Sequence, residues 1–124
     1  MAVPILKQGP FLIATIQSAL TDSDVLQLRD DVMLQVTRHR SRGIIVDVTA
    51  LDVMDSFVSR SLQGISRMTR LRGAETVIVG IQPDVAIAMV QFRLNLEPLR
   101  AALDLEAAKA LLDRLTRGDL EDGR

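Results

Sequence analysis

The order of hydrophobic and polar positions divides the chain into short apolar runs and longer stretches with helical spacing. Continuous apolar runs predict strands at residues 11–17, 44–48 and 76–80, because strands covered on both faces show no polar alternation. Another strand is predicted at 3–7, with a turn signal at 8–10 between it and the next strand. Two strands joined by so short a turn must run antiparallel.

Apolar residues spaced three or four positions apart predict four helices. The first is expected to begin at Thr21, which has capping-box spacing to Asp24, and to run to about His39, with Gly43 as its stop signal. The second is expected at 56–71. The third is expected to open at Gln82-Pro83 and the last to follow Asp104, after a short strand near 100–103. The residues expected on the apolar side of the third helix are Val85, Ala86, Met89 and Val90.

This alternation of strands and helices predicts an α/β fold. We expect one domain over residues 1–117, with a mixed, mostly parallel sheet of four to five strands, an N-terminal antiparallel hairpin and about four helices. The polar residues 118–124 are expected to form a disordered tail.

Composition narrows the function classes. The net charge of −1 gives no field that would attract nucleic acid or acidic lipid, and with no Trp or Tyr the chain has few platforms on which bases can stack. The absence of Cys excludes disulfides and thiolate chemistry. No signal peptide or membrane-length apolar stretch is found, so we expect a cytoplasmic protein without a cofactor.

A loop with three acidic residues, Asp47, Asp52 and Asp55, leads into Ser56 at the start of the second helix. One interpretation makes Ser56 simply the helix N-cap, whose hydroxyl accepts a backbone hydrogen bond. The other makes it a phosphorylation site, and the two are compatible. A phosphate there would meet free N–H groups and change the charge of the loop by about −1.5 to −2.

Arginines follow Ser56 on the same helix. Arg60 lies four residues after Ser56, within reach of a phosphate, and Arg67 lies seven residues further on the same exposed face. The alternative is an ordinary solvated face without a partner.

Asp47 permits a different function. An Asp at the carboxyl end of a central parallel strand is typical of a phospho-acceptor in a receiver domain. That site also needs an acidic pair after an earlier strand, where this chain has Ser18 and Ala19, and a lysine after a later strand, where it has Gln82. Two of the three required parts are therefore missing.

Other chemistry has little support in the sequence. His39 is the only histidine and lies at a basic helix end, which indicates an ordinary surface residue. The carboxylates show no metal-binding spacing. The basic run 38–42 is short and lacks aromatics, so it does not predict nucleic-acid binding.

Several segments resemble the STAS domain, the family of anti-sigma-factor antagonists, and within it the RsbS-type scaffold proteins of the stressosome. The resemblance covers nearly the whole chain. The segments that carry it are Asp47-Val48-Thr49, Val53-Met54-Asp55-Ser56-Phe57, Ala74-Glu75-Thr76-Val77-Ile78-Val79-Gly80 and Gln82-Pro83-Asp84-Val85-Ala86.

The resemblance implies a non-enzymatic scaffold and phospho-switch. It implies co-assembly with RsbR-type sensor proteins. It also implies that an RsbT-type serine kinase binds the scaffold, phosphorylates it and is then released, and that a phosphatase later removes the phosphate. By this resemblance the phosphorylated residue is Ser56, with Ser59 as the alternative. The residues implied to contact the partner are Ser56 itself and Asp55, Phe57 and Arg60 beside it. Many family members have glycine two places after the motif serine, where this chain has Val58.

Overall fold

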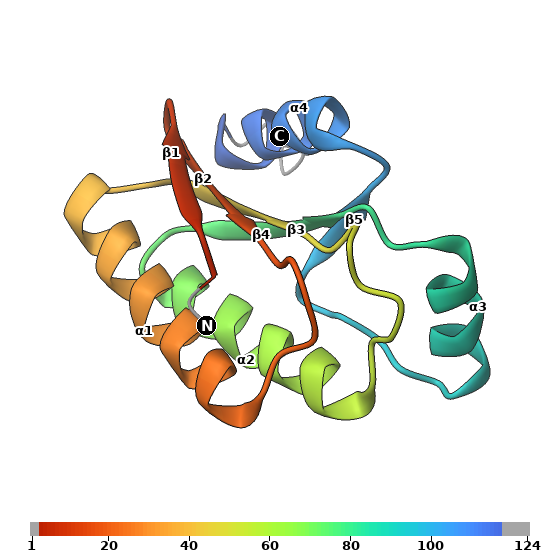
Figure 1. The fold of residues 1–124 in the computed structure, drawn as a ribbon. Helices are drawn as coiled ribbons and strands as arrows, with labels where there is room; N and C mark the ends of the chain where they lie inside the picture. The colour runs from red at the N-terminus through yellow and green to blue at the C-terminus, as the bar shows by residue number, and fades with distance from the viewer. Residues whose placement is uncertain (1–2, 118–124) are drawn as a thin grey trace.

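A five-stranded sheet forms the centre of the computed structural model, which describes residues 3–117 (Figure 1). The strands lie side by side in their order along the chain. The first pair is antiparallel and the others are parallel. The strands are β1 (Ile5–Gln8), β2 (Phe11–Thr15), β3 (Gly43–Asp47), β4 (Glu75–Val79) and β5 (Arg100–Ala102). The predicted mixed sheet with an N-terminal hairpin is thus confirmed.

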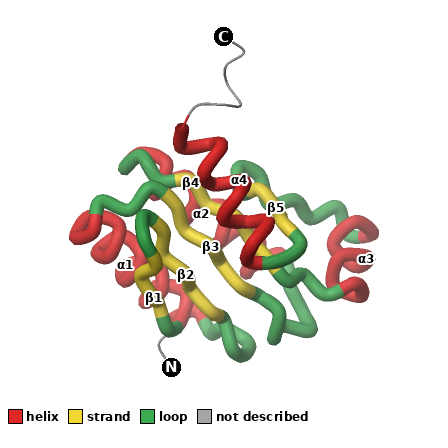
Figure 2. Tube along the Cα trace, turned by 90° about the horizontal axis from the view of Figure 1, so that it is seen from above, coloured by secondary structure: helices red, strands yellow, loops and turns green. Residues whose placement is uncertain are grey.

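Four helices surround the sheet, as the spacing of apolar residues predicts. α1 and α2 cover one face and α4 lies across the other, while α3 stands beyond the β5 edge (Figures 1 and 2). The helices are α1 (Asp22–His39), α2 (Ser56–Leu71), α3 (Pro83–Gln91) and α4 (Leu105–Arg117). None of the helices between residues 3 and 117 has the length and apolar character needed to cross a membrane.

The hydrophobic core has two parts, one on each face of the sheet. Alternate residues of a strand point to opposite faces, so Leu12 and Ala14 join the larger cluster under α1 and α2, while Phe11 and Ile13 join the smaller one under α4. Because β2, β3 and β4 are covered on both sides, their sequences are continuously apolar rather than alternating.

Helix capping agrees with the sequence at two of the predicted starts. Thr21 and Asp24 form both hydrogen bonds of a capping box, and Asp104 Oδ1 accepts the Ala107 N–H at 2.9 Å. The strand predicted at 3–7 is shifted, since β1 spans Ile5–Gln8 and begins after Pro4. The predicted tail, 118–124, lies outside the described residues.

Gly43 does not end the first helix, contrary to the prediction. α1 ends at His39, and Arg40 takes the left-handed conformation (φ 50°) that usually favours glycine. Gly43 instead begins β3 beneath α4, where a Cβ atom would lie 2.8 Å from both terminal methyl carbons of Leu112. This glycine therefore leaves room for the Leu112 side chain in the packing between the strand and α4.

The prediction of which residues form the apolar side of α3 is only half correct. Val85 and Met89 are buried, but Ala86 and Val90 are exposed. Because α3 lies at the edge of the sheet, it buries a narrow stripe and leaves Ile87 and Val90 in solvent.

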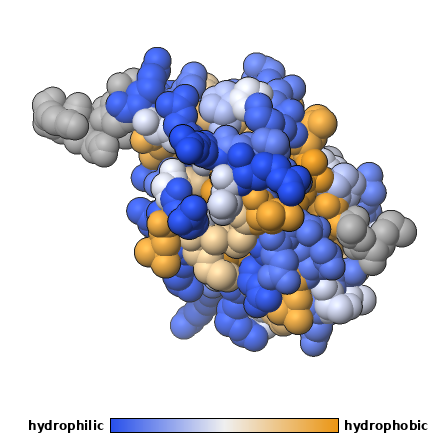
Figure 3. Space-filling model, turned by 90° about the vertical axis from the view of Figure 1, so that its left-hand side faces the viewer, coloured by the Kyte–Doolittle hydropathy of each residue, from blue (hydrophilic) through white to orange (hydrophobic). Residues whose placement is uncertain are grey.

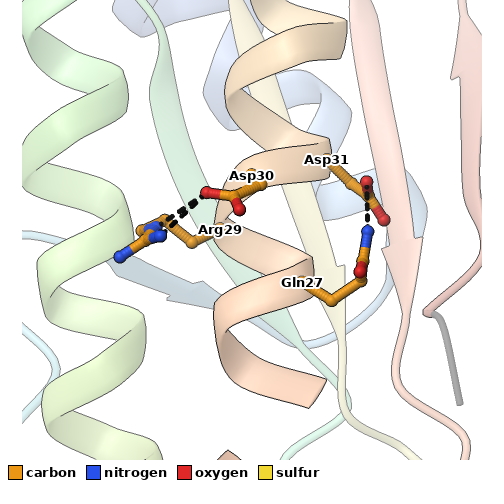
Figure 4. Close-up of polar contacts among 4 residues, drawn as sticks. All are labelled: Gln27, Arg29, Asp30 and Asp31. Atoms are coloured by element: carbon orange, nitrogen blue, oxygen red, sulfur yellow. Dashed lines mark hydrogen bonds and ion pairs between the residues drawn. The ribbon is translucent and has the colours of Figure 1, made fainter. Parts of the chain in front are cut away.

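The outer surface of α1 forms its polar contacts within the helix itself. Gln27 donates to Asp31 at 2.9 Å, and Arg29 pairs with its neighbour Asp30 at 2.9 Å (Figure 4). A pair four residues apart, such as Gln27 and Asp31, stabilises a helix by only about 0.2–0.5 kcal/mol, and an exposed ion pair between neighbours such as Arg29 and Asp30 adds little. The β1 and α1 side of the molecule is largely hydrophilic, with hydrophobic areas interrupted by polar ones (Figure 3).

Candidate functional site

α2 begins at Ser56 as predicted, but its N-cap lies one residue before the one that the sequence suggests. Asp55, not Ser56, is the N-cap, and its Oδ1 accepts the Val58 N–H at 2.9 Å. The Ser59 N–H bonds to the Asp55 carbonyl at 3.0 Å. Both Asp and Ser are strong N-caps, so the sequence alone does not decide between two adjacent candidates.

Ser56 is therefore the first residue of the helix, and capping leaves its hydroxyl unused. Its side chain is exposed, and it makes no hydrogen bond within residues 3–117. The Asp55 carboxylate caps the helix without help from Ser56. A change to the Ser56 hydroxyl consequently need not disturb the helix start.

The rival serine lies in a different environment. Ser59 is only 2% exposed, and its hydroxyl has no hydrogen-bond partner within the described residues. Arg60 next to it is exposed, as is Arg67, so these arginines share the solvent side of α2 as predicted. Phe57 is half-buried and packs against the larger core cluster, which limits the area that it offers to a partner.

A hollow of about 420 Å³ lies between the loop before α2 and helix α3. We call it the apolar hollow. Met54 and Val85 are its buried members, whereas Val53 and Phe92 stand 71% and 73% exposed at its sides. Its lining residues are Asp52, Val53, Met54, Asp55, Ser56, Asp84, Val85, Ala88, Phe92 and Leu94. Exposed apolar groups gathered around a hollow are typical of a protein-interaction site.

Three carboxylates give the apolar hollow a negative rim. Asp52 and Asp84 are exposed, and neither forms an ion pair within residues 3–117; Asp55 is the helix cap. Ser56 belongs to the same rim. The arrangement suits a partner that presents an apolar side chain flanked by cations.

Asp47 has a structural part in the loop after β3. Its Oδ1 accepts hydrogen bonds from the Thr49 N–H at 2.9 Å and from the Thr49 hydroxyl at 2.6 Å. Gln82, at the place where a receiver domain needs lysine, donates to the Thr49 carbonyl at 2.7 Å. Gly80 (φ 82°) fits closely against Thr49, where a Cβ atom would collide with the threonine hydroxyl. Asp47 and Gln82 thus shape this loop together. Within the described residues no three side chains are grouped to hold a metal ion.

The sequence-based reasoning missed the α3 side of the site, namely Asp84 and Phe92. A signal was present, because the carboxyl ends of adjacent parallel strands lie at the same edge of a sheet. The loop after β3 and the start of α3 after β4 must therefore meet. Phe92, one of only three aromatics, followed by Arg93 in a polar segment, was a second signal.

Comparison with known proteins identifies the family. The model of the STAS domain matches residues 2–110. A solved serine-to-glutamate variant of RsbS from Moorella thermoacetica is 35% identical, with 93% of this chain and 97% of that chain covered and a TM-score of 0.76. A chain from a structure of the stressosome, described as a signal integration and transduction hub, is 36% identical, with 92% and 99% covered and a TM-score of 0.75.

A curated relative is the RsbT co-antagonist protein RsbRA of Bacillus subtilis (strain 168), 29% identical over 70 residues, or 56% of this chain. The chain spans only about a quarter of the length of that relative, since the match covers 26% of it. The fold resemblance expected from the Asp55-Ser56 segment and its companions is confirmed. The chain belongs to the STAS domain family and, within it, is similar to the stressosome protein RsbS.

Proposed function

We propose that this protein is a non-enzymatic scaffold of a stressosome-like complex, switched by phosphorylation of Ser56. The observation that carries the proposal is the place of Ser56: an exposed hydroxyl, unused by the fold, on the rim of the apolar hollow. The similarity to RsbS over nearly the full length of both chains supports the scaffold role. The similarity to RsbRA supports RsbR-type STAS proteins as its assembly partners.

The apolar hollow is the proposed docking site of an RsbT-type serine kinase. An apolar side chain of the kinase enters between Val53 and Phe92, and its cations face Asp52 and Asp84. Docking there brings the kinase beside Ser56. Phosphorylation then adds about −1.5 to −2 charge to a rim that is already acidic.

The added charge acts on the interface rather than on the fold. Asp55 continues to cap α2, because its bond to the Val58 N–H does not involve the Ser56 hydroxyl. At the interface, docking strips water from the phosphate. This desolvation cost outweighs the attraction between the phosphate and the cations of the kinase, so the complex weakens and the kinase is released. A phosphatase that removes the phosphate from Ser56 restores the first state.

Burial supports Ser56 over its rival as the acceptor. Phosphorylation of Ser59 would require a hydroxyl that is 2% exposed to leave the packed side of α2 and enter the active site of a kinase. Ser56 requires no such movement.

The test is the intact mass of the protein after incubation with the kinase and Mg-ATP. Wild type and Ser59→Ala are expected to gain one phosphate, and Ser56→Ala none, because Ser56 alone presents an accessible hydroxyl at this site. Peptide mapping of the phosphorylated wild type then locates the phosphate. Full phosphorylation of Ser56→Ala would show that the acceptor is wrongly assigned.

A further inference from the structure

A second, smaller hollow of about 150 Å³ lies on the other side of Ser56, between α2 and the segment that follows α3. We call it the basic hollow, because Arg60 and Arg93 line it together with Ser56 and Ser59. Both arginines are exposed, and neither has an ion-pair partner in the part of the chain that the structure describes. Two unneutralised cations thus border the same small space as the serine hydroxyl.

The Ser59 hydroxyl is an independent sign that this hollow takes a polar ligand. Ser59 is one of the lining residues, its hydroxyl is buried, and within the described residues this hydroxyl has no hydrogen-bond partner. A buried hydroxyl without a partner costs free energy, so native structures seldom keep one without a reason. If the Ser59 side chain turns from the packed side of α2 toward the hollow, an acceptor oxygen there can satisfy its hydroxyl.

Arg93 has an unusual backbone that places it here. It adopts φ 56°, and its N–H bonds to the Val90 carbonyl at 3.2 Å, while the Leu94 N–H bonds to the Met89 carbonyl at 2.8 Å. These are the two bonds of a Schellman motif, whose left-handed position is normally glycine. The left-handed residue that follows α3 is thus an arginine, and it lies in the wall of the basic hollow.

The segment carrying Arg93 is also fixed against α2. Gln63 Nε2 donates to Asn95 Oδ1 at 2.9 Å and to the Glu97 carbonyl at 3.0 Å. These bonds join the two walls of the basic hollow. The site is therefore built before any ligand arrives.

We propose that the basic hollow receives the phosphate carried by Ser56, with Arg60 and Arg93 as its cationic contacts and the Ser59 hydroxyl as a donor. This inference rests on Ser56 as the phosphorylated residue. The free N–H groups at the start of α2 add partial positive charge beside the same hollow. The Asp55 carboxylate, which would repel a phosphate, already accepts a hydrogen bond from the Val58 N–H.

The consequence concerns the docking surface. Leu94 lines both hollows, and Phe92 and Leu94 flank Arg93 in the chain. A phosphate that holds Arg93 acts directly on the segment that forms one side of the apolar hollow. Phosphorylation thus alters the kinase site through this segment as well as through charge.

The test uses the full chain with phosphoserine installed at position 56 during translation, so that no kinase is needed. Phosphorus NMR follows the pH at which the phosphate takes up a proton, which is about 6 for an unperturbed phosphoserine. Nearby cations favour the dianion, so in the folded protein we expect this pH to lie at least roughly 0.5 unit below its value for the same chain in urea.

Arg93→Gly is the decisive variant, because glycine suits the left-handed position and the substitution removes the guanidinium together with the rest of the side chain. It is expected to abolish at least half of the shift, and Arg93→Lys to restore part of it. Arg60→Gln is expected to reduce the shift as well. Arg67→Gln is the matched control, since Arg67 lies 11 positions from Ser56, roughly 16 Å along the helix, and should leave it unchanged.

Two results would overturn the inference. In the first, the phosphate of the wild type takes up its proton at the same pH in the folded and the unfolded chain. In the second, the Arg93→Gly variant keeps the full shift of the wild type. Neither result would bear on whether a kinase modifies Ser56, which the mass measurement decides separately.

Discussion

Replacing Phe92 with alanine is expected to weaken kinase binding about tenfold or more, equivalent to about 1.4 kcal/mol. Phe92 is 73% exposed at the side of the apolar hollow, so the free protein gains little from its ring. In a complex the ring would be buried, and exposed aromatics at the centre of an interface commonly carry much of the binding energy. Isothermal titration calorimetry with unphosphorylated protein measures the change.

Val90→Ala is the matched control for Phe92→Ala. Val90 is 78% exposed near the end of α3, two positions before Phe92, but does not line the hollow. The control should bind as wild type does, and urea unfolding should show that neither variant has lost its fold. Unchanged affinity for Phe92→Ala, or an equal loss in Val90→Ala, would place the kinase elsewhere.

Truncating Leu112 to alanine is expected to lower the free energy of unfolding by about 2–5 kcal/mol. Leu112 is completely buried and, together with Ala108, packs α4 on the smaller core cluster. Its removal leaves a cavity between the helix and the sheet, which a rigid interior fills only in part. Since a domain is stable by only about 5–15 kcal/mol, urea unfolding will show the loss clearly.

Gly43 allows a sharper form of that experiment. A Cβ atom at Gly43 would lie 2.8 Å from the Leu112 methyl carbons, so Gly43→Ala alone should destabilise the domain by about 1–3 kcal/mol through overpacking. In the Leu112→Ala background the added methyl enters the cavity instead. The double variant should therefore be more stable than the sum of the two losses predicts. Strict additivity would mean that the two residues do not share this space.

The sequence was sufficient for those features that depend on local patterning. The apolar runs locate the central strands, and the start of α2 at Ser56 follows from helical spacing. The capping box at Thr21 and the cap at Asp104 follow from short-range hydrogen bonding. The position of the acidic loop beside Ser56 can also be predicted from the sequence, since the loop directly precedes Ser56 in the chain.

The features that the sequence did not predict depend on tertiary neighbours. Gly43 resembled a helix stop, but its role is set by Leu112, which is distant in sequence. Val90 fits an apolar stripe, yet α3 lies at the sheet edge and leaves this residue in solvent. Phe92 and Arg93 reach the site only because the segment after α3 folds back onto α2 through Gln63.

The relation between Ser56 and kinase binding is measured most directly by comparing two forms of the same chain. One form is unmodified, and the other carries phosphoserine at position 56. The dissociation constant of each with the kinase is measured at physiological salt. We predict that the phosphorylated form binds at least about tenfold more weakly while its unfolding midpoint in urea is preserved. Equal affinity, or tighter binding by the phosphorylated form, would contradict a switch at Ser56.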